Sequence, residues 1–240
     1  MAFVNAQQTR IMWGAQPLAA YVRTVTPSAT RDMLDVTTLA DSGKSFIGGL
    51  TDWSLRVDGL FDSTTTAGSL LADMTSNLSS GATVATSVAP AGFSAGSSVW
   101  LIPAKTVSYE PSSSVADAVQ FAAEFGSGTA PALGISLADL AAVTSTSNSA
   151  SQDNAASSSA GAVAHLHISA VSGTTPTLAV VVQHSTNNSA WTTLASFTSA
   201  STVGSEVITV TGTVNRYVRA AFTVGGTTPS FTCQVSLARY

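Results

Sequence analysis

Charged residues are scarce in this chain of 240 residues. Lys and Arg number 9 and Asp and Glu 13, so charged side chains make up 9% of the sequence, against roughly 25% in ordinary soluble domains. The formal net charge is −4, and no stretch gathers the few basic residues into a stripe that could neutralise a run of phosphates, which excludes tight nucleic-acid binding. The apolar share of 45% excludes a charge-rich disordered protein, because burial of that surface can offset the entropy of ordering.

The chain contains one cysteine and no long apolar run. The single cysteine, Cys233, has no partner for a disulfide within the chain. The first residues, MAFVNAQQTRIMWG, contain no cationic segment followed by an apolar core, so we expect no signal peptide. Ser, Thr, Gly or Asp interrupts every apolar run before it reaches the roughly 18 residues of a transmembrane helix, so we expect no membrane span.

The clearest shift in composition lies at residues 144–161, TSTSNSASQDNAASSSAG. This stretch of small polar residues contains no large apolar side chain, which is typical of a flexible linker. It predicts two domains, residues 1–143 and 162–240, joined by a linker at 144–161.

The first domain has the sequence pattern of a sheet with one helix. In WSLRVDGLFD, residues 53–62, apolar and polar residues alternate, which predicts a half-buried strand. The apolar positions expected in the core are Trp53, Leu55, Val57 and Phe61. The residues that follow predict a short amphipathic helix with Asp62 or Ser63 as its N-cap.

The second domain has the sequence pattern of strands throughout. Segments rich in β-branched and aromatic residues follow one another with no helical period, which predicts an antiparallel β-sandwich. Gly-Thr-Thr-Pro occurs twice, at residues 173–176 and 226–229, and we expect both copies to be turns that connect strands, because Pro cannot donate within a ladder.

Two short motifs resemble parts of enzyme sites. GFSAG at residues 92–96 matches the nucleophile elbow of hydrolases, but it precedes a predicted strand instead of a helix, so we interpret it as a hairpin turn around Ser94. DSGKS at residues 41–45 ends like a phosphate-binding loop but lacks the opening glycine, so we expect an exposed turn.

The histidines do not form a convincing metal site. His165, His167 and His184 have no neighbouring carboxylate in the sequence to orient their rings. We therefore interpret them as surface residues, and we assign no catalytic, cofactor-binding or metal-ligating residue. An enzyme and a cofactor are not expected.

A resemblance adds what the chemistry does not. The segment DVTTLADSGKSFIGGLTDWSLRVDGLFD, residues 35–62, resembles the major tail tube proteins of long non-contractile-tailed, siphovirus-type bacteriophages, with Asp-x-Thr, a short loop, Phe-Ile-x-Gly-Leu and an alternating strand. The following helix, SVWLIPAKTVSYE and SVADAVQFAAEFGSG are similar in order. The resemblance covers about residues 1–143. Residues 162–240 resemble β-sandwich modules appended to phage tail and capsid proteins.

The resemblance implies a structural virion protein, synthesised in the cytoplasm of the host bacterium. Its first domain is expected to be a mainly β tail-tube sandwich or barrel with one short helix, and its copies to close into hexameric rings. Stacked rings would form the tail tube, through which DNA passes without specific binding. The expected partners are the tape measure, tail terminator and distal tail proteins. The second domain, an Ig-like or jelly-roll-like antiparallel sandwich, is expected on the tube exterior and to be dispensable for assembly.

Two segments are expected to cross between subunits. One is the N-terminal stretch with Trp13, Tyr21 and Val22, and its deletion over residues 1–12 is expected to abolish tubes but leave the monomer folded. The other is the glycine-bearing loop around residues 41–49, with Asp41, Lys44 and Phe46.

Two acids of the alternating strand, Asp58 and Asp62, are expected to face the lumen or a neighbouring subunit. Two other functions stay open. A carbohydrate-binding or adhesive protein could use Trp191 and Tyr217 as a platform for a host-surface glycan. A capsid decoration protein would be a virion component of different symmetry.

Overall fold

The computed structural model describes residues 5–66 and 68–240 and is built almost entirely of antiparallel strands. The described part contains one α-helix, so the predicted class, mainly β with one short helix, is confirmed. The chain forms two compact units. Unit 1 contains residues 5–20, 83–103 and 132–240, and unit 2 contains residues 21–82 and 104–131.

Unit 1 consists of strands and two 3-10 turns: η1 (Ala6–Gln8), β1 (Arg10–Trp13), β2 (Gln16–Pro17), η2 (Leu18–Ala20), β5 (Val84–Ala89), β8 (Ala132–Val143), β9 (Ser147–Asn148), β10 (Gln152–Asp153), β11 (Ala162–Ser185), β12 (Thr192–Ser196), β13 (Gly204–Val210) and β14 (Tyr217–Arg239). Unit 2 contains β3 (Val22–Asp35), β4 (Phe46–Leu60), α1 (Leu70–Ser80) and β7 (Gln120–Gly126). Strand β6 (Ser98–Ser112) contributes residues to both units.

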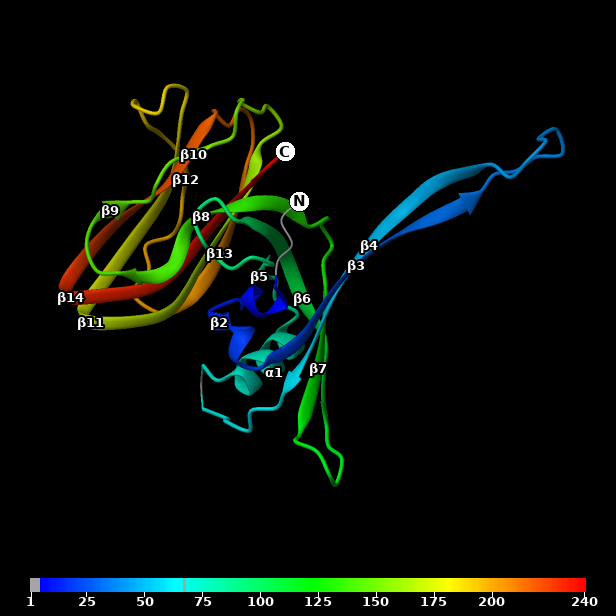
Figure 1. Ribbon diagram of the computed structural model, residues 1–240, viewed down its shortest axis with the longest axis horizontal. Helices are drawn as coiled ribbons and strands as arrows, with labels where there is room; N and C mark the ends of the chain where they lie inside the picture. Colours follow the sequence, from blue (N-terminus) through cyan, green and yellow to red (C-terminus); the bar gives the residue numbers. More distant parts are fainter. Residues whose placement is uncertain (1–4, 67) are drawn as a thin grey trace. The chain divides into compact units, whose positions relative to one another are not determined.

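The longest strand pairing in unit 1 is the ladder between β11 and β14, which lie side by side in Figure 1. The pairing runs from Ala162 opposite Arg239 to Ser185 opposite Tyr217. Strands β12 and β13 pair with β11, and β8, β9 and β10 pair with β14. One apolar cluster takes side chains from both halves of the ladder, such as Ile168 and Leu178. The ladder therefore bends so that its two halves close over a common core.

The bend lies at the two Gly-Thr-Thr-Pro segments, which pair with each other through Thr174 and Thr227. Gly173 and Gly226 have φ angles of 117° and 107°, a region that favours glycine. A Cβ at Gly173 would lie 2.8 Å from the carbonyl oxygen of Thr228, and one at Gly226 would lie 2.6 Å from the carbonyl oxygen of Thr175. The prediction that these segments end their strands is wrong. They are mutually packed bends within two long strands, and the local shifts of register accommodate the prolines.

The segment at residues 144–161 is not a free linker, so that prediction is wrong. Asn148 pairs with Ala221 and Gln152 with Val218, which places β9 and β10 along β14. Asp153 forms an ion pair of 2.6 Å with Arg216. Small polar residues suit this position, because their backbone groups pair with β14 and no side chain needs a core of its own.

The predicted division into residues 1–143 and 162–240 is also wrong. Strand β8 pairs with β14 across that boundary, for example Ile135 with Leu237. A second apolar cluster combines residues from the beginning and end of the chain, and its members are Met12, Ala89, Phe93, Val99, Leu101, Ala132, Val163 and Ala238. Residues 162–240 therefore share their core with the N-terminal strands. Their assignment as an Ig-like or jelly-roll-like module stays a prediction.

Unit 2 contains an antiparallel sheet in the order β3, β4, β7, β6. The predicted alternation is confirmed: Leu55 and Val57 are buried, whereas Arg56 between them is exposed. Trp53 and Phe61 are half-buried.

Helix α1 begins later than the sequence predicts. Its N-cap is Ser69, whose Oγ accepts a hydrogen bond from the backbone N–H of Ala72. The expected cap, Asp62, instead accepts hydrogen bonds from the backbone N–H and hydroxyl of Thr64. That carboxylate closes a local turn and is not available to cap a helix.

Replacing Gly173 or Gly226 with Ala should destabilise unit 1. Both positions combine a positive φ with backbone atoms within 3 Å of the added methyl group, so we expect a loss of about 2 kcal/mol or more in the free energy of unfolding. Urea unfolding would measure it. Gly204→Ala is the matched control, since a Cβ there meets nothing within 4 Å. An equal effect of all three variants would contradict the assignment.

A chain that ends at Ser145 should not form unit 1. The truncation removes β11 and β14, to which β8 is paired, and leaves the cluster around Met12 without Val163 and Ala238. We expect poorly dispersed amide resonances for residues 5–20 and 83–103. Dispersed resonances with cooperative unfolding of this variant would show instead that residues 146–240 are dispensable for the fold.

Candidate functional site

Half of the exposed large apolar side chains in the described part of the chain lie on the outer part of the β3–β4 hairpin, a two-stranded ribbon in Figure 1. We define the arm as residues 29–53, the part beyond Ser54, where β4 ceases to pair with β7. Its exposed apolar residues are Met33, Leu34, Val36, Leu39, Phe46, Ile47 and Leu50. Leu50 is 83% exposed and Leu39 is fully exposed. Surfaces of this kind usually contact a partner.

Apolar side chains occupy both faces of the arm. Leu34 lies opposite Ile47, so this pair shares one face. The adjacent pairs place Phe46 and Met33 on the other face. A two-stranded ribbon with solvent on both faces is at best marginally stable in water. The arm therefore has the composition of a segment that becomes covered on both faces.

Hydrogen bonds within the loop fix the shape of the arm's tip, residues 36–45. The Asp41 carboxylate accepts from the backbone N–H and hydroxyl of Thr38 at 2.7 and 3.0 Å. The Asp35 carboxylate accepts from the backbone N–H and hydroxyl of Thr37, and these bonds lower its pKa. Residues 41–45 are exposed, as predicted for this turn. The ordered tip presents Leu39 outward.

The structure brings three of the predicted inter-subunit residues together. Asp41 and Lys44 lie in the tip and Phe46 opens β4 beside them, and all three are exposed. Tyr21 and Val22 are half-buried at the base of β3, where the Tyr21 carbonyl accepts from the backbone N–H of Leu60. Their contacts with a neighbouring subunit stay a prediction.

Trp13, which was predicted to contact a neighbouring subunit, is buried inside unit 1. It is 1% exposed, on β1, where it pairs with Thr86 of β5, so it belongs to a core and not to an exposed arm. Ile11 and Met12 beside it are buried as well. Deleting residues 1–12 would remove both from unit 1, so we expect this deletion to destabilise the monomer as well as to affect assembly. Residues 1–4 lie outside the described part of the chain.

The inter-subunit residues predicted from the sequence did not include most apolar residues of the arm, above all Leu34, Leu39, Ile47 and Leu50. A signal was present, because apolar residues within or beside a Gly- and Asp-containing turn lack the spacing that would bring them to a core. Their exposure became evident only once the hairpin was seen to extend beyond β7.

The sheet of unit 2 carries an acidic outer face. Arg56 forms an ion pair of 3.0 Å with Asp58, and Glu110 and Glu124 also act on it, so the pKa of Arg56 is raised, chiefly by the hydrogen bond from Arg56 to Asp58. The register places all four opposite the buried Leu55 side of the sheet. Lys105 lies opposite Gly126 and is exposed on the same face, so three carboxylates and two cations lie there.

Asp62 lies just beyond the end of β4. The hydrogen bonds from Thr64 lower the pKa of its carboxyl group. The role predicted for Asp58 and Asp62, at a lumen or an interface, stays a prediction.

The interpretation of the histidines as surface residues is wrong for two of them. His165 and His167 are both fully buried, because β5 and the turn at Gly14 cover their face of β11. His184 is half-buried, and its Nδ1 accepts from the backbone N–H of Asn215. Among residues 5–66 and 68–240, no group of three or more His, Cys, Asp or Glu side chains is placed to hold a metal ion.

The hydrolase-like motif is a turn, as predicted. It connects β5 and β6, with Gly92 and Gly96 at positive φ. Phe93 is buried and Ser94 is exposed.

The two aromatic residues considered for sugar binding stack with arginines. The guanidinium of Arg219 lies 4.2 Å from the centroid of Trp191 and donates to the side-chain oxygen of Gln183 at 2.8 Å. Arg216 lies 4.9 Å from the centroid of Tyr217. One face of each ring is therefore covered by a cation, which does not favour stacking of a sugar on that face.

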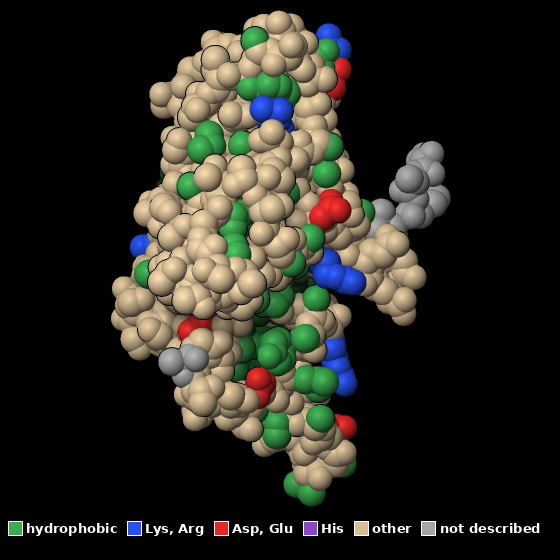
Figure 2. All heavy atoms as spheres, turned by 90° about the vertical axis from the view of Figure 1, so that its left-hand side faces the viewer, with side chains coloured by type: hydrophobic (Ala, Val, Ile, Leu, Met, Phe, Trp, Pro, Cys, Tyr) green, Lys and Arg blue, Asp and Glu red, His purple; other side chains and the backbone are tan. Residues whose placement is uncertain are grey.

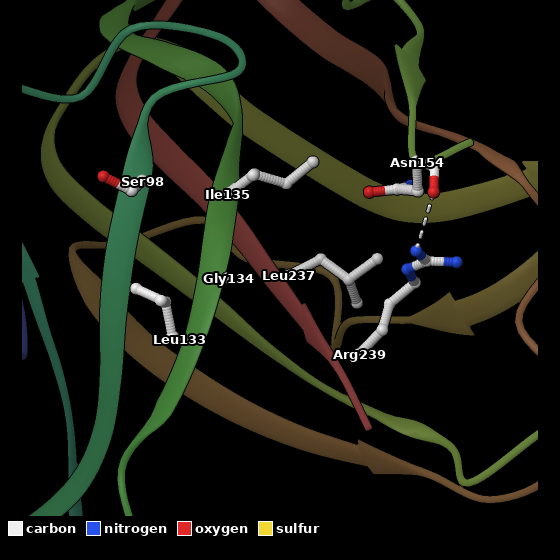
Figure 3. A pocket seen from close by; sticks show the side chains of 7 residues that line it. All are labelled: Ser98, Leu133, Gly134, Ile135, Asn154, Leu237 and Arg239. Atoms are coloured by element: carbon white, nitrogen blue, oxygen red, sulfur yellow. Dashed lines mark hydrogen bonds between the residues drawn. The ribbon is translucent and has the colours of Figure 1, made fainter. Parts of the chain in front are cut away.

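A shallow hollow of about 350 Å³ lies in unit 1, and Figure 3 shows the side chains that line it. Leu133, Ile135 and Leu237 form its apolar wall. Arg239 donates to the carbonyl oxygens of Ala156 at 2.7 Å and Asn154 at 3.3 Å. The guanidinium thus braces the backbone of the neighbouring turn, and the hollow shows no catalytic arrangement.

On the face shown in Figure 2, side chains of Lys, Arg, Asp and Glu are few. None of the helices in the described part of the chain is long and apolar enough to cross a membrane.

Several solved structures are similar to this chain. A chain of the virion of the native gene transfer agent particle matches with 17% identity and a TM-score of 0.44, over 54% of this chain and 97% of that one. The phage SPP1 Dit protein, described as a paradigm of the hub adsorption apparatus in phages that infect Gram-positive bacteria, matches with 12% identity and a TM-score of 0.40, over 97% and 99%. A chain of the six-fold symmetrised baseplate of the anti-feeding prophage matches with 10% identity and a TM-score of 0.39, over 55% and 97%.

Because these TM-scores all lie below 0.5, the matches transfer no function to this chain. Comparisons with protein-family models and with curated proteins give no match.

The arm should exchange its amide hydrogens quickly in the monomer and slowly once it is covered. Residues 29–35 and 46–52 have no strand partner besides each other among the described residues, so few contacts oppose local opening. Hydrogen–deuterium exchange at low and high protein concentration would measure this, with β7 as the internal control. Slow exchange of the arm in the monomer would show that it needs no partner.

Proposed function

We propose that this chain is a structural protein of a bacteriophage tail, whose copies close into hexameric rings that stack into the tube for DNA. The observation that carries the proposal is the arm, a hairpin with exposed apolar side chains on both faces. Its tip and second strand belong to residues 35–62, the segment that resembles major tail tube proteins. The chain acts without catalysis, as a virion component made in the host cytoplasm.

The partner proposed for the arm is a second copy of this chain. A self-assembling subunit must offer both a projecting element and a site that receives it, and such a heterologous contact propagates into rings or filaments. The charges of the arm have both signs, and they are those of the bases Arg31 and Lys44 and the acids Asp32, Asp35, Asp41 and Asp52. Mixed charge of this kind suits contact between identical subunits, because neither surface repels its copy.

The acidic face of unit 2 is proposed to line the lumen. Three carboxylates, of Asp58, Glu110 and Glu124, outnumber two cations, Arg56 and Lys105, on this face. Its net negative charge would repel phosphate and let DNA pass without specific contacts. Asp58 would thus face the lumen as part of this acidic face. We assign Asp62, just beyond the end of β4, to the lumen as well.

Residues 162–240 are proposed to face the tube exterior, as part of unit 1 and not on a swinging linker. This placement leaves the lumen free. The tape measure, tail terminator and distal tail proteins are the proposed partners at the ends and inside of the tube.

Substituting the apolar residues of the arm should abolish assembly without unfolding the subunit. Burial of a Leu, Ile or Phe side chain contributes about 1.5–3 kcal/mol, so Leu39→Ser, Phe46→Ser or Ile47→Ser should each weaken assembly by roughly tenfold or more. Electron microscopy with light-scattering mass of the concentrated protein would measure this. Val203→Ser is the control, because Val203 is similarly exposed but lies in unit 1.

The outcomes separate the alternatives. Hollow tubes of constant width, lost in the arm variants and kept in the control, would support the proposal. Single six-membered rings that never stack would point to a hub, and trimers or monomers that bind a shell to a capsid decoration protein. A stable monomer that binds glycans would favour the carbohydrate-binding alternative, and arm variants that form normal tubes would refute the role of the arm.

A further inference from the structure

A serine hydroxyl joins two buried histidines inside unit 1. His165 and His167 lie on the same face of β11, with ring centroids 6.0 Å apart. The Oγ of Ser87, on β5, lies 3.2 Å from His165 Nδ1 and 2.8 Å from His167 Nε2. His167 Nδ1 lies 2.7 Å from the carbonyl oxygen of Gly14. Ser87, His165 and His167 have no exposed surface.

The protons of this network have one consistent arrangement when both rings are neutral. The Gly14 carbonyl can only accept, so His167 carries its proton on Nδ1 and accepts at Nε2. Ser87 then donates to His167 and accepts from Nδ1 of His165. His165 Nε2 is left as a buried acceptor with no hydrogen-bond partner. A further proton would have to enter at that nitrogen, or break the bond between Ser87 and His167.

No charge among the described residues compensates a proton added there. On β5 the neighbours are Ser87 and Thr86, and the uncharged backbone of Thr86 raises the pKa of His165 less than burial lowers it. On β14, Gln234 lies opposite His167 and Ser236 opposite His165. Strand β13 presents Val207 and Ser205.

The charged groups on the neighbouring elements form hydrogen bonds with other residues or lie on the opposite face of β11. Glu206 pairs with Leu166, on the other face of β11, and its carboxylate accepts from Thr198. Arg10 of β1 is exposed and donates to backbone carbonyls. Cys233 faces the opposite core. Ser136 of β8 contributes only a hydroxyl, which accepts from Gln234.

We propose that the Ser87-bridged histidine pair is an acid-sensitive lock, which joins the edge formed by β1, β2 and β5 to the β11–β14 ladder and opens when the pair is protonated. Its bonds connect the Gly14 turn and β5 to β11, and the bond that Ser87 donates to His167 Nε2 requires a neutral His167 ring. A doubly protonated imidazole cannot accept from Ser87, and two adjacent cations would repel each other. The lock is independent of the assembly proposed above.

The direction of the pH dependence follows from burial. Desolvation lowers the pKa of His167 to about 4 and that of His165 well below its ordinary value. In an open state both would take up protons below pH 6.5. The open state therefore binds more protons as pH falls, so the closed state is most stable above pH 6.5 and loses stability from there down to about pH 4.

Hydrogen exchange of the full-length monomer, corrected for the intrinsic rate at each pH, tests this. Between pH 6 and 5, where ordinary carboxyl groups stay ionised, two buried histidines should raise the opening constant up to about 100-fold per pH unit. The effect should appear in peptides that cover β1, β5 and residues 162–168. His165→Gln and His167→Gln should each reduce it to about tenfold, and the effect should be absent from β7 of unit 2.

His184→Gln is the matched control, since His184 is half-buried and lies outside the network; it should behave like the wild type. If either Gln variant fails to fold, nitrogen chemical shifts of the wild-type imidazoles replace it. Both rings should then stay neutral down to pH 5 with the proton on Nδ1. Titration of either ring near pH 6.5 in the folded protein, or a wild-type slope of one proton or less, would overturn the proposal.

Discussion

The mutual packing of two Gly-Thr-Thr-Pro segments is the constraint on which unit 1 depends. Gly173 and Gly226 each lie so close to the backbone of the other segment that no side chain fits. This contact bends the two longest strands of the chain at the same point. The bend lets side chains from both halves of the ladder enter one core. Because β8, β9 and β10 all pair with β14, the rest of the unit is assembled on this bent ladder.

The bent ladder also explains why polar groups lie deep in unit 1. Residues 162–168 are buried on both faces of β11, one face against the main core and the other beneath β5 and the Gly14 turn. A strand covered on both faces usually carries apolar side chains on both. Here one face carries His165 and His167, and the hydroxyl of Ser87 lies within hydrogen-bond distance of one nitrogen of each ring. Stability of this layer therefore depends on protonation as well as on packing.

In unit 2, the long β3–β4 hairpin is covered along only part of its length. Near its base the hairpin is covered, with Leu55 and Val57 buried, whereas the arm leaves its apolar residues exposed on both faces. The hairpin thus has a base whose apolar side chains are buried and an arm whose apolar side chains are exposed. This contrast is the physical basis of the proposed assembly, because exposed apolar surface gains stability only through contact with another molecule.

The sequence by itself determined the features that depend on neighbouring residues. The period of two in residues 53–58 fixed which side chains are buried, and the glycine-bearing segments at 41–45 and 92–96 fixed two turns, because side-chain direction and φ angles are local properties. Only the tertiary structure decided which strands pair. It showed that residues 144–161 lie along β14, that Trp13 and two histidines are covered, and that the arm extends beyond its sheet. Each of these depends on residues distant in the sequence, whose backbone hydrogen bonds and apolar surfaces become available only when the chain has folded.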